Sequence, residues 1–100
     1  MRPFCPADLT AAARLLWCTP FKDRNPCLFR LFSCADAADR YRKRLGKCHA
    51  LWGDGSVAGY IGMNFDLPAE PPLSARGYLE AKLAVLHGFL EWRDTQKRMA

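Results

Sequence analysis

Apolar residues recur every three to four positions in two long stretches of the chain, and this spacing predicts a helix in each. The first stretch, residues 7–18, places four apolar residues on one face: Leu9, Ala12, Ala13 and Leu16. Pro6 suits the first turn of this helix, Asp8 lies near its positive end, and Pro20 ends it.

The second stretch runs from Ala75 to about Lys97, with Ser74 as its N-cap and the stiff linker Leu67–Pro72 before it. Its apolar positions form a wide stripe: Tyr78, Leu79, Leu83, Val85, Leu86, Phe89, Leu90 and Trp92. Such width predicts a helix that is buried against the fold on one side and covered by a partner on the other.

A middle helix is predicted from a capping signal, Ser33 followed three residues later by Asp36. Asp39 adds a second acid near the positive end, and Gly46 provides a stop. The expected core stripe consists of Cys34, Ala37, Ala38, Tyr41 and Leu45.

Three shorter apolar runs favour strands. After a predicted loop over Thr19–Pro26, the run Cys27–Phe32 resembles a buried strand that Arg30 interrupts. The runs Cys48–Trp52 and Ser56–Phe65 flank Asp54-Gly55, a dipeptide typical of a type I′ hairpin turn.

These elements predict one α+β domain over residues 1–100, in the order (β)αβαββα. The sheet would be partly antiparallel with three strands, or four if Arg2–Phe4 pairs, and the last helix would pack across one face. A chain of 100 residues that is 50% apolar can bury a substantial core.

The net charge of +5 favours anionic partners: nucleic acid, an acidic protein surface or an anionic membrane. No stretch approaches the ~18 consecutive apolar residues of a membrane span, and the N-terminus lacks the apolar run of a secretion signal. We therefore expect a cytoplasmic protein without membrane association.

The positive charge is concentrated in residues 40–47, where the cations are Arg40, Arg42, Lys43, Arg44 and Lys47. Four of them, at positions 40, 43, 44 and 47, would project from one face of the middle helix. We interpret them as a partner-binding surface for phosphates or acidic side chains. The alternative is a solvated helix end that is stabilised by the helix dipole.

The candidates for metal binding and catalysis are weak. The five cysteines, Cys5, Cys18, Cys27, Cys34 and Cys48, form no C-x-x-C pair and lie in apolar surroundings, so we expect buried free thiols. A zinc site with His49 or His87 is the alternative. His87 and Glu91 could share a metal or form an ion pair. In the hairpin His49 would face Tyr60, as an acid–base pair or as packing partners.

Two segments resemble GNAT-type N-acyltransferases. Met1-Arg2-Pro3-Phe4 with Pro6-Ala7-Asp8-Leu9 is similar to the first strand and helix of that family, and residues 51–61 are similar to the hairpin after its second helix. The resemblance implies an acyl-CoA enzyme. However, the glycine-rich Arg-x-x-Gly-x-Gly loop that holds the pyrophosphate is missing, so no catalytic or cofactor-binding residue can be assigned.

The sequence therefore predicts a non-enzymatic, stoichiometric binding protein that uses no cofactor and no metal. A small adaptor or inhibitor encoded by a phage or mobile element, of which anti-CRISPR proteins are an example, fits its size. Its partner would be an acidic protein or a nucleoprotein complex. The alternatives are a degenerate GNAT-like acyltransferase and a nucleic-acid-binding accessory protein.

Overall fold

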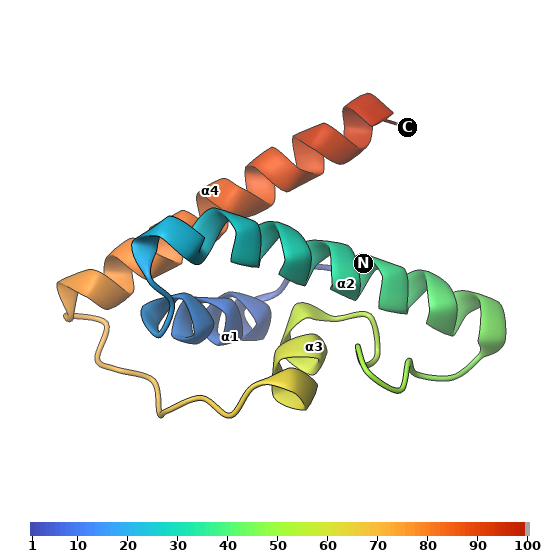
Figure 1. Cartoon of the computed structure of the whole chain (residues 1–100), viewed down its shortest axis with the longest axis horizontal. Coiled ribbons are helices and arrows are strands. Elements are labelled where there is room, and N and C mark those ends of the chain that lie inside the picture. The colour runs from blue at the N-terminus through green and yellow to red at the C-terminus, as the bar shows by residue number, and fades with distance from the viewer. Residues whose placement is uncertain (100) are drawn as a thin grey trace.

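The computed structural model describes residues 1–99 and consists of helices joined by irregular segments (Figure 1). Its elements are α1 (Pro6–Trp17), the 3₁₀ turn η1 (Phe21–Asp23), α2 (Arg24–Leu45), α3 (Val57–Asn64) and α4 (Arg76–Met99). The only β pairing in the described residues is an isolated bridge between His49 and Gly53. The predicted α+β class is therefore wrong, and the described chain is all-α.

The core forms where α1 packs against α3 and α4, and α2 packs against the same two helices. Ala12, Ala13 and Leu16 of α1 are completely buried, in agreement with the core face predicted for this helix. Of the wide stripe predicted on α4, Tyr78 and Val85 are completely buried, whereas its four leucines are exposed. An aromatic cluster joins the N-terminal segment to α2 and α4, with Phe4 stacked on Phe89 at 4.5 Å between ring centroids.

The predicted strand Cys27–Phe32 lies inside α2, which begins nine residues before the expected cap at Ser33. Pro26 indicated a loop, but it occupies the first helical turn, where a missing N–H costs nothing. The buried face of α2 comprises Leu28, Leu31, Phe32, Ala35, Ala38 and Asp39, so the helical spacing extends through the expected strand. The predicted stripe is displaced from this face, and its last member, Leu45, is 51% exposed.

The predicted hairpin is also wrong, because its second strand is helix α3. Ser56 is the N-cap, and its hydroxyl accepts a hydrogen bond from the Gly59 N–H at 2.9 Å. Asp54 Oδ1 in turn accepts from the Ser56 N–H at 3.0 Å. Asp54 and Gly55 thus build a helix start, and Val57, Tyr60 and Ile61 are buried at helical spacing.

Asp8 joins the starts of two helices. Its Oδ2 accepts a hydrogen bond from the Cys5 N–H at 2.9 Å at the N-terminus of α1, and its Oδ1 accepts from the Ala58 N–H at 2.9 Å in α3. The side chain is almost completely buried. One carboxylate therefore satisfies free amides of both helices and complements both dipoles.

The N-terminal segment Arg2–Phe4 forms no strand. It packs beside the loop before α3 through one backbone hydrogen bond, from the Arg2 N–H to the Gly55 carbonyl at 3.0 Å. None of the helices described here is long and apolar enough to cross a membrane.

Candidate partner-binding surface

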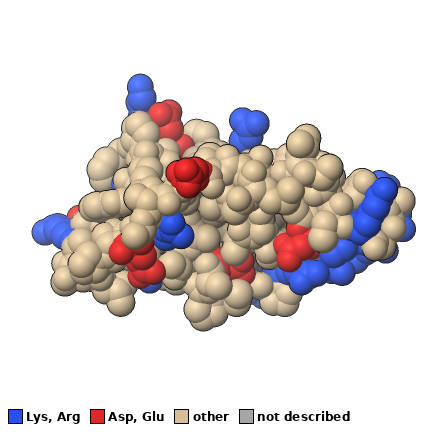
Figure 2. Space-filling view, turned by 90° about the horizontal axis from the view of Figure 1, so that it is seen from below, with Lys and Arg blue, Asp and Glu red and all other residues tan. Residues whose placement is uncertain are grey.

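The predicted basic cluster lies at the C-terminal end of α2 and just beyond it. Arg40, Lys43 and Arg44 are exposed on the helix, which ends at Leu45 with Gly46 in the left-handed conformation at φ 71°. Lys47 is exposed in the following loop rather than on the helix. Figure 2 shows lysine and arginine side chains gathered at this end of the molecule. We call Arg40, Arg42, Lys43, Arg44 and Lys47 the basic end.

Three of these cations are engaged by two aspartates one turn earlier. Arg40 lies 3.3 Å from Asp36, and Arg42 and Lys43 lie 2.9 and 3.0 Å from Asp39. Within residues 1–99, Arg44 and Lys47 form no ion pair, so they carry the free positive charge of the basic end.

Asp39 is the centre of this charge network. Burial would raise the pKa of its carboxyl, but hydrogen bonds from Lys43, Arg42 and the amine of Met1 outweigh that effect and lower the pKa to about 2. The Met1 amine lies 3.3 Å from Asp39 and 2.6 Å from Asp36. The sequence indicates Asp39 only as a dipole-stabilising acid, because nothing local shows that it would be buried.

A shallow groove of about 300 Å³ runs beside the basic end, lined by Ala37, Arg40, Tyr41, Arg44, His49 and Trp52. His49 stacks on Trp52 with ring centroids 4.7 Å apart, and Tyr41 meets the imidazole edge to face at 4.9 Å. His49 Nδ1 accepts hydrogen bonds from the N–H groups of Leu51 and Trp52, at 3.0 and 3.1 Å. Its Nε2 is therefore the ring nitrogen that can donate.

Sequence reasoning missed this groove. The apolar pattern assigns Tyr41 to the core, and it assigns His49 and Trp52 to a strand. The hairpin that would place His49 opposite Tyr60 does not form in the described chain, and Tyr60 instead lines a separate pocket.

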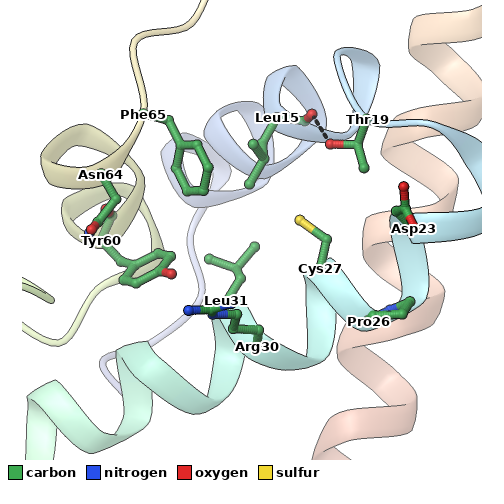
Figure 3. Close-up of a pocket in the computed structure, with 10 residues that line it drawn as sticks. All are labelled: Leu15, Thr19, Asp23, Pro26, Cys27, Arg30, Leu31, Tyr60, Asn64 and Phe65. Atoms are coloured by element: carbon green, nitrogen blue, oxygen red, sulfur yellow. Dashed lines mark hydrogen bonds between the residues drawn. The ribbon is translucent and has the colours of Figure 1, made fainter.

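That separate pocket, of about 470 Å³, lies between α1, α2 and α3 (Figure 3). Leu15, Leu31 and Phe65 form apolar walls, and Cys27 and Tyr60 contribute polar atoms. Burial raises the pKa of both the Cys27 thiol and the Tyr60 hydroxyl. Both groups are therefore neutral at pH 7, and the pocket holds no thiolate nucleophile.

The cysteines are less buried than predicted. Cys5, Cys18 and Cys48 are exposed, Cys27 and Cys34 are half-buried, and all five are free. In the described part of the chain no three His, Cys, Asp or Glu side chains gather as a metal site would require. His87 and Glu91 are exposed on α4.

Neither glycine near the C-terminal half lies in an open phosphate-binding loop. A Cβ on Gly77 would lie 2.6 Å from the Trp17 ring, and a Cβ on Gly88 would lie 2.7 Å from Leu28 Cδ1. Both positions are points of close helix packing. The segment 51–61, which resembles a GNAT hairpin, is a loop followed by the start of α3.

A family model described as a domain of unknown function (DUF7742) matches residues 2–89 of the chain. No curated protein and no solved structure matches the chain.

Proposed function

Because the chain belongs to the DUF7742 family, a domain of unknown function, we propose its role from its own surface: a non-catalytic, cytoplasmic adaptor or inhibitor that docks on an acidic partner protein through the basic end of α2. The observation that carries this proposal is the pair of exposed cations, Arg44 and Lys47, which form no ion pair within residues 1–99, with Arg44 also lining an aromatic groove.

The two parts of this surface suit different tasks in binding. Exposed cations attract an acidic partner and accelerate encounter, but each contributes little affinity alone. Tyr41, His49 and Trp52 offer rigid aromatic area with polar atoms, the kind of side chain that dominates binding energy at interfaces. The groove would therefore hold an apolar or aromatic anchor of the partner, and the cations would meet acidic side chains around it.

The ion pairs favour an acidic protein over nucleic acid. A protein that follows a phosphate backbone needs several free cations, and its affinity then falls steeply with salt. Here Asp36 and Asp39 already neutralise three of the five cations of the basic end. Two free cations match a local acidic cluster better than an extended polyanion.

Charge reversal at the free cations tests the proposal. The variant Arg44→Glu with Lys47→Glu should capture its specific partner about tenfold less well, because it repels the acidic surface. A control of equal charge change, Lys22→Glu with Arg98→Glu, alters exposed cations outside the basic end and should capture normally. Affinity capture from the native host, followed by titration of the captured protein, measures both.

Both variants should unfold within about 1 kcal/mol of the native chain, because the changed residues are exposed. Equal capture by a folded Arg44→Glu, Lys47→Glu variant would refute the proposal. Labelled DNA and RNA should be titrated across salt concentrations in parallel. Tight binding that weakens steeply with salt would replace the acidic protein with nucleic acid as partner.

A further inference from the structure

The pocket between α1, α2 and α3 has apolar walls that the fold itself does not fill. Leu15 of α1 and Leu31 of α2 are buried core residues whose side chains also line the pocket. Phe65, at the end of α3, lines it as well and is 41% exposed. A volume of about 470 Å³ with mostly apolar walls and a few polar groups is typical of a site for a small molecule.

One of the polar groups is Arg30, the charged residue within the apolar run Cys27–Phe32. In Figure 3 its guanidinium points from α2 toward the ring of Tyr60 on α3. Within residues 1–99 Arg30 forms no ion pair. Because arginine stays charged at every physiological pH, this part of the pocket keeps a positive charge without a protein counter-ion.

The Tyr60 hydroxyl is a second donor at the same place. Burial raises the pKa of Tyr60 and of Cys27, and the charge of Arg30 opposes the rise in both, so the guanidinium lies near both groups. The thiol of Cys34 is the hydrogen-bond partner beside the Tyr60 hydroxyl, and sulfur is a weak acceptor. A stronger acceptor in the pocket could therefore take the hydroxyl proton as a hydrogen bond.

We propose that this pocket binds a free fatty carboxylate of about eight carbons, with its head on Arg30 and the Tyr60 hydroxyl and its chain between Leu15 and Leu31. A carboxylate accepts charge-assisted hydrogen bonds from a guanidinium, which are stronger than those between neutral groups. An apolar chain in the pocket would cover Phe65 and remove its ring and the chain from water.

Asp23 limits the length and the charge of the ligand. It lines the same pocket at the end opposite Tyr60 in Figure 3, and it precedes Arg30 by seven residues, roughly 10 Å along a helix. An extended chain of about eight carbons, with C–C bonds of about 1.5 Å, spans a similar distance. A second acidic group at the far end would be repelled by Asp23, so the ligand is a monocarboxylate.

Calorimetric titration of octanoate into the full chain tests the site. Octanoate should bind one to one with a dissociation constant of about 100 µM and should raise the melting temperature. Octanol has the same chain without the carboxylate and should bind several-fold more weakly, and octylamine should bind more weakly still because Arg30 repels it. No saturable binding at millimolar octanoate, or equally tight binding of octanol or octylamine, would overturn the proposal.

Substitution of the two donors tests where the carboxylate lies. Arg30→Gln should weaken octanoate binding about tenfold and leave octanol binding unchanged, because it removes the charge and keeps the walls. Tyr60→Phe should weaken octanoate binding several-fold. The matched control Arg44→Gln removes another exposed arginine of α2, outside the pocket, and should bind octanoate normally. An Arg30→Gln variant with native affinity, or an Arg44→Gln variant with the same loss, would refute the assignment.

A second control separates the pocket from the exposed leucines of α4. Leu83→Glu changes a leucine that is 58% exposed and does not line the pocket, so octanoate binding should not change. Loss of binding in this variant would place the acid on α4 and overturn the proposal. Helical circular dichroism should be unchanged in every variant. The pocket residues lie outside the basic end, so octanoate binding is measurable whether or not an acidic partner exists.

Discussion

Two buried aspartates, Asp8 and Asp39, each connect segments that are distant in sequence. Asp8 accepts amide hydrogen bonds at the starts of α1 and α3, and Asp39 pairs with cations of α2 while the Gly55 loop lies against it. The sequence shows both residues as acids near helix ends. Asp8, for example, is buried through a contact with Ala58, 50 positions away, and a local sequence pattern does not contain such a contact.

The lowered pKa of Asp39 makes the free energy of unfolding depend on pH. Because the pKa of about 2 in the folded state lies below the ordinary 3.8, the stabilisation provided by ionised Asp39 is fully present above pH 4 to 5 and is lost as pH falls toward 2. We expect Asp39→Asn to be less stable than the native chain by about 2 kcal/mol at pH 7 and equally stable near pH 2. Urea unfolding at a series of pH values measures this difference. A gap that does not narrow in acid would contradict the assignment.

The elements differ in how well the sequence predicts them. Helices α1 and α4 are predicted correctly because their periodic stretches are long and are bounded by Pro or Ser. The first part of α2 and all of α3 are mistaken for strands because each apolar run is short. Over such lengths the spacing of a helix and that of a buried strand are hard to tell apart. The deciding features, Pro26 within a first turn and Ser56 as an N-cap, fit both interpretations until the packing is known.

A pair of glycine substitutions distinguishes helix α3 from the hairpin. Gly62 lies in α3, and a Cβ added there would meet nothing within 4 Å, so Gly62→Ala should stabilise the protein by about 1 kcal/mol through helix propensity. Gly55 has φ 97°, and its Cβ would lie 2.6 Å from Asp39 Cα, so Gly55→Ala should destabilise it by about 2 kcal/mol or more. Denaturant unfolding measures both. A Gly62→Ala variant that loses stability would favour a strand.

At the scale of the whole molecule, the sequence predicts where the positive charge lies but not how much of it is free. Within the described residues, ion pairs with Asp36 and Asp39 leave Arg44 and Lys47 as the unpaired members, and the aromatic groove that Arg44 lines is assembled from a helix and a loop. That juxtaposition depends on the path of residues 46–56. The hairpin interpretation of the sequence therefore does not predict the groove.

The whole fold also bears on the acyltransferase alternative. Gly77 and Gly88 both lie within helix α4 and are packed closely against Trp17 and Leu28, so they do not form the glycine-rich loop that holds a pyrophosphate. We therefore expect acetyl-CoA at millimolar concentration to leave the melting temperature unchanged, whereas any ligand of the folded state raises it. A saturable rise with a micromolar dissociation constant would restore the GNAT resemblance as kinship.

The bridge made by Asp8 has a consequence for how the molecule opens. Helix α3 has only eight residues and is too short to persist by itself in water. Its first turn shares a carboxylate with α1, so separating α3 from the body strips a buried acid of one amide partner and exposes the other helix start. The groove-forming loop before α3 is attached to that same junction. Local opening of α3 is therefore coupled to unfolding of the rest of the helical fold. The loop before α3 is in this way held in place more stably than a loop of its length would be by itself.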